Sequence, residues 1–101
     1  MDFSIRNADA GTEIQLKGSM TFADHESFRD VIAAFDGPPG HRMVFDLSGL
    51  DFVDSSGLGM FIIARETAEK KKLDFSLRGA RDDVRRLISV AKLHKLFKVA
   101  D

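Results

Sequence analysis

The alternation of apolar and polar positions along the chain predicts several short strands. Residues 3–8 and 12–18 each alternate with a period of two, and a turn at residues 10–11 joins them, so they are expected to form a β-hairpin. Residues 73–78 alternate in the same way and form another strand with one exposed face. Residues 42–47 are apolar almost without interruption, which is typical of a strand buried on both faces of a sheet.

Apolar residues recur at helical spacing in three other segments. The first helix follows Thr21, which forms a capping pattern with Asp24, and it ends at the glycines and prolines of residues 37–40. The second extends from about residue 56 to 70, and the third begins at residues 82–83. The apolar stripes of the first and third helices comprise Phe28, Val31, Ile32, Phe35, Val84, Leu87, Ile88 and Ala91.

A short last strand over residues 96–99 completes the pattern. The predicted order is strand, strand, helix, strand, helix, strand, helix, strand, and helices that alternate with buried strands imply an α/β layer with crossover connections. A chain of 101 residues fits one domain. We therefore expect a single α/β domain over residues 1–101, with a mixed β-sheet of four to five strands and three or more α-helices.

Charge and composition argue against several classes of obligate partner and of site. The chain has 15 basic and 16 acidic side chains and a net charge of -1, whereas nucleic acids and anionic membranes select a basic excess. There is no cysteine, which excludes disulfides and thiolate metal sites. The first residues do not resemble a signal peptide, and the longest apolar run, residues 58–64, is too short to span a bilayer. We expect a cytoplasmic protein without a nucleic-acid or membrane partner.

The segment Asp-Ser-Ser-Gly-Leu-Gly, residues 54–59, is the most unusual in the chain. It lies after a predicted strand and at the start of a predicted helix, an edge where α/β proteins often carry functional sites. Ser55 or Ser56 could serve as the helix N-cap, but a cap needs neither a second hydroxyl nor two glycines. Each glycine costs a helix about 1 kcal/mol relative to alanine, so Gly57 and Gly59 indicate that something approaches the backbone closely.

Three chemical interpretations of this segment differ in what they require. A serine nucleophile needs a nearby base, but the Gly-x-Ser-x-Gly pattern is absent and His25, His41 and His94 are all expected at the surface. A phosphate-binding loop would end in Gly-Lys-Ser or Gly-Lys-Thr, which is also absent. A phosphorylated serine needs neither a nearby base nor a phosphate-binding loop. Its charge, about -1.5 to -2, is tolerated at a helix N-terminus but repels a partner docked beside Asp54.

The string VFDLSGLDFVDSSGLGMFIIAR, residues 44–65, closely resembles the signature of STAS-domain proteins of the anti-sigma-factor antagonist class, and the resemblance covers the whole chain. It implies that Ser55 is the phosphoacceptor and that Ser56 is its neighbour. It also implies that the unphosphorylated protein binds an anti-sigma factor that is a serine kinase, and that a metal-dependent serine phosphatase resets the cycle. ATP and metal would belong to those partners, so we expect no cofactor and no enzymatic activity in this chain.

The partner is expected to dock around Ser55. The expected contact residues are Asp54, Ser56, Gly57, Gly59, Met60, Ile63 and Thr21. Phe22 is expected to act as a hydrophobic staple at the start of the first helix rather than as a contact. Two alternatives keep the same fold: a STAS module that acts on a response regulator or on a secretion or biofilm pathway, and a STAS module that binds a nucleotide at the glycine-rich helix start.

Overall fold

A computed structural model describes residues 1–8, 10–95 and 97–100 and shows one five-stranded sheet in the order β1-β2-β3-β4-β5. Its strands are β1 (Asp2–Ala8), β2 (Gly11–Met20), β3 (Arg42–Val53), β4 (Asp74–Arg78) and β5 (Lys98–Ala100). β1 pairs with β2 in antiparallel register, and every later pair is parallel. The expected hairpin and the mixed sheet are thus confirmed. Leu96, where the last strand was expected to begin, lies outside the described residues.

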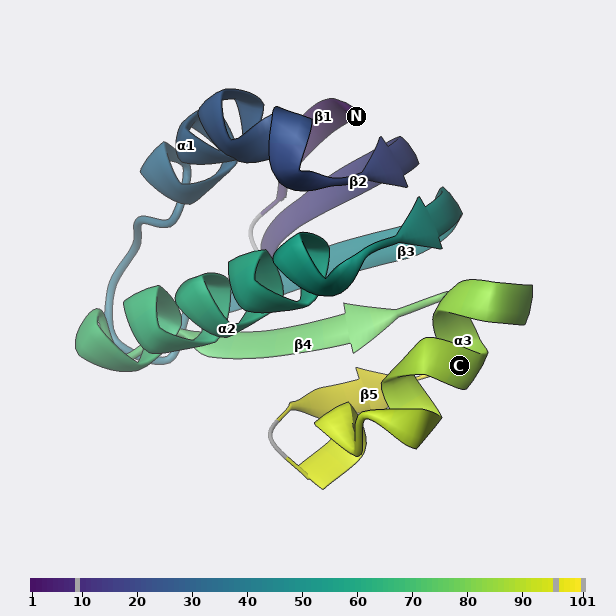
Figure 1. The fold of residues 1–101 in the computed structure, drawn as a ribbon. Coiled ribbons are helices and arrows are strands. Elements are labelled where there is room, and N and C mark those ends of the chain that lie inside the picture. Colours follow the sequence, from purple (N-terminus) through teal and green to yellow (C-terminus); the bar gives the residue numbers. More distant parts are fainter. Residues whose placement is uncertain (9, 96, 101) are drawn as a thin grey trace.

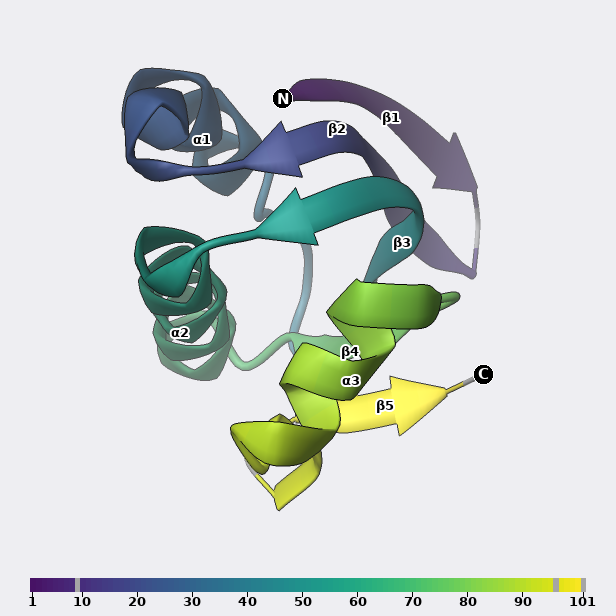
Figure 2. The ribbon, with the colours of Figure 1, turned by 45° about the vertical axis from the view of Figure 1, so that its right-hand side comes forward.

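The helices follow the expected order. They are α1 (His25–Ala33), α2 (Ser55–Lys70) and α3 (Asp82–Val90), with short 3-10 turns η1 (Phe22–Asp24) and η2 (Leu93–Lys95). Figures 1 and 2 show α1 and α2 side by side over one face of the sheet, whereas α3 lies near β5. The Thr21 N–H donates to the Asp24 carboxylate over 2.7 Å, so the predicted capping pair holds the turn that leads into α1.

The core lies between the sheet and the helices α1 and α2. At its centre the Phe45 ring of β3 contacts phenylalanine rings from four other positions in the fold: Phe28, Phe35, Phe61 and Phe75. The Phe45 and Phe75 rings meet edge to face at 4.8 Å, a favoured geometry for aromatic pairs. The apolar stripe of α1 supplies Phe28 and Val31, and that of α3 supplies Val84 and Ile88. This packing fixes α2, and with it the start of that helix.

β3 is longer than the sequence pattern predicts. The pattern predicts a strand over residues 42–47, but β3 continues to Val53 and stays paired with β2 as far as the contact between Met20 and Val53. Two register shifts against β2, each with one extra residue in β3, accommodate the added length, and Leu50 and Val53 are buried. The strand therefore delivers the Asp54–Gly59 segment directly beside the end of β2.

Candidate functional site

Ser55 is the first residue of α2 and follows the carboxyl end of β3. Asp54 stands between them as the N-cap, and its N–H donates to the Met20 carbonyl at the end of β2 over 3.2 Å. The 3-10 turn η1 begins two residues after Met20. The ends of β2 and β3, the turn η1 and the start of α2 therefore meet at one corner of the molecule (Figure 1). This is the edge at which the sequence places the site.

The side chain of Asp54 ties this corner together. One carboxylate oxygen accepts the Gly57 N–H over 2.9 Å and so caps α2. The other accepts the Phe22 N–H of η1 over 3.3 Å. The alternative that Ser55 or Ser56 caps the helix is therefore wrong, because the N-cap is Asp54 and its carboxylate already accepts an N–H of the first turn. Neither serine is required for the cap.

Replacing Asp54 with alanine should lower the free energy of unfolding by about 1–2 kcal/mol, since it removes the cap of α2 and the acceptor for Phe22. Asparagine keeps one amide oxygen that can cap α2, but its NH2 group cannot accept the second N–H, so it should cost about 0.5–1 kcal/mol, less than alanine. Urea unfolding of the two variants and the wild type measures the difference. Equal stability of Asp54→Ala and wild type would show that the carboxylate does not hold this corner.

The Ser55 side chain is exposed, and Ser56 beside it is half-buried. The N–H groups in the first turn of a helix have no acceptor within the helix, and together with the helix dipole they favour negative charge. Because the Ser55 side chain is exposed, a modifying enzyme can reach its hydroxyl. A phosphate added there meets a helix end that tolerates negative charge. The prediction that Ser55 is the phosphoacceptor is compatible with this geometry.

The two glycines of the segment have different roles. A methyl group on Gly57 would lie 2.7 Å from the Met20 carbonyl oxygen and 2.5 Å from a methyl carbon of Val53. The close approach expected from the glycine pattern thus comes from the ends of this chain's own strands. At Gly59 an added methyl group would meet nothing within 4 Å. Gly59 therefore leaves open space on the surface of α2.

Burial corrects part of the expected contact surface. The Met60 side chain is fully buried in the core, and Gly57 is buried against β2 and β3, so neither offers a side-chain contact to a partner. Ile63 is 45% exposed, as a contact residue must be. Met60 and Ile63 differ because α2 packs on the sheet through the residues Gly57, Met60, Phe61, Ala64 and Ala68. Asp54, Ser56 and Thr21 are half-buried at the same corner.

An apolar groove between α1 and α2 adds residues of α1 that the sequence did not indicate as part of the site. It has a volume of about 340 Å³ and is lined by His25, Phe28, Arg29, Ile32, Met60 and Ile63.

Phe22 is 72% exposed, and its ring meets the His25 ring edge to face at 5.2 Å. The expectation that Phe22 is a staple is wrong, because η1 turns its side chain toward solvent. The sequence singles out Phe22 by its position just before the first helix, but it does not reveal that the side chain is exposed.

Two histidines, His41 and His25, are engaged in local contacts. His41 is held at 3.0 Å from the Thr12 hydroxyl, which in turn donates to the Asn7 amide oxygen, and His25 packs on Phe22. The side chain of His94 lies outside the described part. Within residues 1–8, 10–95 and 97–100, histidine, aspartate and glutamate side chains form no cluster of three or more that would hold a metal ion. In the same residues no helix has the length and apolar character needed to cross a membrane.

Several known proteins resemble this chain. Residues 3–99 match the family model described as "Mlab, STAS domain". The STAS-domain containing protein PA14_20770 of Pseudomonas aeruginosa is 32% identical over 87 residues, which are 86% of this chain and 85% of that protein.

Two solved structures share the fold. An anti-sigma factor antagonist from Mycobacterium paratuberculosis superposes with a TM-score of 0.82 at 25% identity and covers 98% of this chain and 84% of its own. The murine anion transporter Slc26a9 superposes with a TM-score of 0.74 at 27% identity over 89% of this chain and 15% of the transporter. The family match spans nearly every residue that forms the sheet, the three helices and the Ser55 corner, so the chain belongs to the STAS-domain family.

Proposed function

We propose that this protein is a cytoplasmic anti-sigma factor antagonist that acts as a phosphorylation-controlled partner switch. With Ser55 unphosphorylated it binds an anti-sigma factor that is also a serine kinase, and with Ser55 phosphorylated it releases that partner. The observation that carries the proposal is the exposed Ser55 side chain at the start of α2, where Asp54 already supplies the cap. The similarity to an anti-sigma factor antagonist at 25% identity supports the same function.

The partner docks on the surface around Ser55. This contact surface comprises Asp54, Ser56, Gly59, Ile63, Thr21 and Phe22. Ile63 lines the groove between α1 and α2, and Phe22 packs on His25, which also lines it. Both supply exposed apolar area, which is typical of interaction sites. Gly59 lets the partner's backbone approach α2, because no side chain stands there.

Phosphorylation acts on this surface directly. The phosphate places about -1.5 to -2 charges beside the Asp54 carboxylate, at the centre of the contact surface. The N-terminus of α2 stabilises this charge within the protein itself, whereas a partner that covers the site must desolvate it. The folded protein persists and the complex dissociates. No conformational change is required, and the kinase partner supplies ATP while a phosphatase partner removes the phosphate.

The proposal is tested by phosphorylation of the full chain. With the partner kinase and ATP, the wild-type protein should take up one phosphate on a phosphate-affinity gel, and Ser55→Ala should take up none. Ser56→Ala is the matched control for the acceptor, because it removes the neighbouring hydroxyl. It should still take up one phosphate, although more slowly if the loss of Ser56 weakens docking. Phosphorylation of Ser55→Ala at the wild-type rate, or its loss in Ser56→Ala alone, would contradict the assignment of Ser55.

A second candidate is a STAS module with the same switch and another client, such as a response regulator or a secretion or biofilm pathway. It is favoured by the similarity of this chain to a domain of the transporter Slc26a9, which shows that the fold serves systems other than sigma factors. Parallel pulldowns from the native host with wild type and Ser55→Asp distinguish the two. A sigma-factor-binding kinase retained only by the wild type supports the first candidate, and a different regulator supports the second.

A further inference from the structure

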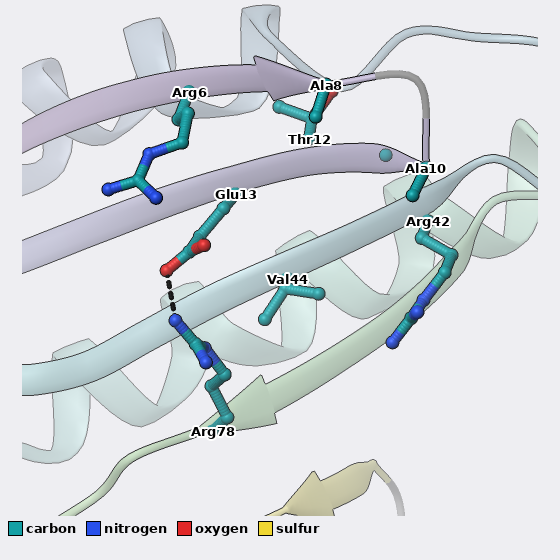
Figure 3. Close-up of a pocket in the computed structure, with 9 residues that line it drawn as sticks. Arg6, Ala8, Ala10, Thr12, Glu13, Arg42, Val44 and Arg78 are labelled. Atoms are coloured by element: carbon teal, nitrogen blue, oxygen red, sulfur yellow. Dashed lines mark hydrogen bonds and ion pairs between the residues drawn. The ribbon is translucent and has the colours of Figure 1, made fainter.

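A second concave site lies away from the Ser55 corner, on the face of the sheet that α1 and α2 leave uncovered. It is a hollow of about 240 Å³ at the end of β1 and at the beginnings of β2 and β3 (Figure 3). Ser55 follows the opposite end of β3. The hollow therefore lies near the start of β3, and only Arg78 comes from the end of a parallel strand. It shares no residue with the contact surface.

Three arginines from three strands line this hollow: Arg6 of β1, Arg42 of β3 and Arg78 of β4. Arg78 is already paired with the Glu13 carboxylate and lies 3.5 Å from Asp46. The side chains of Arg6 and Arg42 are exposed and form neither a hydrogen bond nor an ion pair with any of the described residues. Arg6 stands opposite Glu13 in the β1–β2 register, but the Glu13 carboxylate is engaged by Arg78.

The other described residues of the hollow are mostly small or apolar. Val44 lies between Arg42 and Arg78 in Figure 3, and Ala8 and Ala10 line the end of the hollow near the β1–β2 turn. At Gly11 an added methyl group would lie 2.6 Å from the Arg42 carbonyl oxygen. The absence of a side chain at Gly11 therefore allows the turn to close tightly against the start of β3, which positions Arg42 at the rim.

We propose that this arginine hollow binds a small organic dianion, namely a phosphate monoester or a dicarboxylate. Guanidinium groups bind both kinds of oxyanion through paired N–H donors, and two of the three guanidiniums here are uncommitted. The described lining residues include three arginines and a single carboxylate, so the hollow carries a positive charge and attracts anions. Its volume is below the roughly 300–1,000 Å³ of sites for drug-sized ligands, so it suits a small ligand whose apolar part contacts Val44.

The test is a titration of the ¹⁵N-labelled full chain at low ionic strength, in which the amide chemical shifts report binding. The probes are inorganic phosphate, glycerol 3-phosphate and succinate. Shifts should saturate at Gly11, Thr12 and Val44, with a Kd of about 1 mM for the best probe. Arg42→Gln should weaken this binding about tenfold. Arg86→Gln serves as the matched control. It removes the same charge from an exposed position on α3 and should leave the binding unchanged.

The probes also decide between sources of the anion. Tighter binding of glycerol 3-phosphate than of succinate identifies a phosphate monoester, and the reverse order identifies a dicarboxylate. Absence of saturable shifts with all three probes would overturn the proposal, as would equal weakening by Arg42→Gln and Arg86→Gln. A short acidic peptide serves as a fourth probe. If it shifts these amides and the three small anions do not, the proposal is overturned and the hollow binds a protein partner instead. Because Ser55 remains intact in every variant, failure here leaves the phosphorylation switch untouched.

Discussion

Replacing Ser55 with aspartate should weaken binding of the partner kinase by about 100-fold or more, while the melting temperature stays within about 2 °C of the wild type. The exposed Ser55 side chain loses no internal packing, and a carboxylate in the first turn of α2 interacts favourably with the helix dipole by about 0.3–1 kcal/mol. An unpaired charge covered by a partner instead costs about 2–5 kcal/mol. Calorimetric titration and thermal unfolding of the same preparations measure both quantities.

Ser89→Asp is the matched control for this substitution. Ser89 is an exposed serine on α3, so the variant carries the same added charge away from the contact surface and should bind like the wild type. Binding of Ser55→Asp within about threefold of the wild type would show that charge at Ser55 does not control the partner. A large drop in melting temperature for Ser55→Asp would show that the helix start does not tolerate the charge. Either result contradicts the proposed mechanism.

The order of strands and helices was predictable because the periodicity of apolar residues reports which face of each element is buried. The second half of β3 was not predictable in this way. Ser48, Gly49 and Asp51 interrupt its apolar pattern, and the register shifts against β2 remove the regular period of two. Pairing with β2, rather than local sequence, keeps residues 48–53 in the strand.

The position of Ser55 at the start of α2 was predictable from the sequence, but the contacts around it were not. The hydrogen bond from the Phe22 N–H to Asp54 joins residues 32 positions apart, so no local pattern indicates it. The misassigned exposure of Met60 has another cause. The residues from Leu58 to Ala64 are apolar on nearly all sides of α2, so their spacing does not reveal which of them face the core.

The arginine hollow could not be seen in the sequence for a related reason. Arg6, Arg42 and Arg78 belong to three strands, and only the order of the sheet brings them together. Each of them, taken alone, resembles an ordinary solvent-exposed residue on the polar face of a strand. The sequence therefore indicated the site at residues 54–59, whose residues are contiguous in the chain. It did not indicate the arginine hollow, whose residues are brought together only by the fold.

Gly57→Ala should be the most destabilising substitution at the Ser55 corner and should lower the free energy of unfolding by about 3 kcal/mol. The added methyl group would lie 2.7 Å from the Met20 carbonyl oxygen, which is held by the β2–β3 pairing and cannot move aside like a flexible side chain. The start of α2 must then shift away from the sheet. Urea unfolding measures the loss, and partner binding should weaken as well because Ser55 moves with the helix start.

Gly59→Ala is the matched control, since it makes the same chemical change two residues later in the same helix. The added methyl group there meets nothing within 4 Å, so the variant should gain about 0.5–1 kcal/mol from the higher helix propensity of alanine. The two substitutions should therefore change stability in opposite directions. Equal effects would mean that the strand ends do not pack against α2 as closely as these distances require, and the rigid corner that presents Ser55 would lose its physical basis.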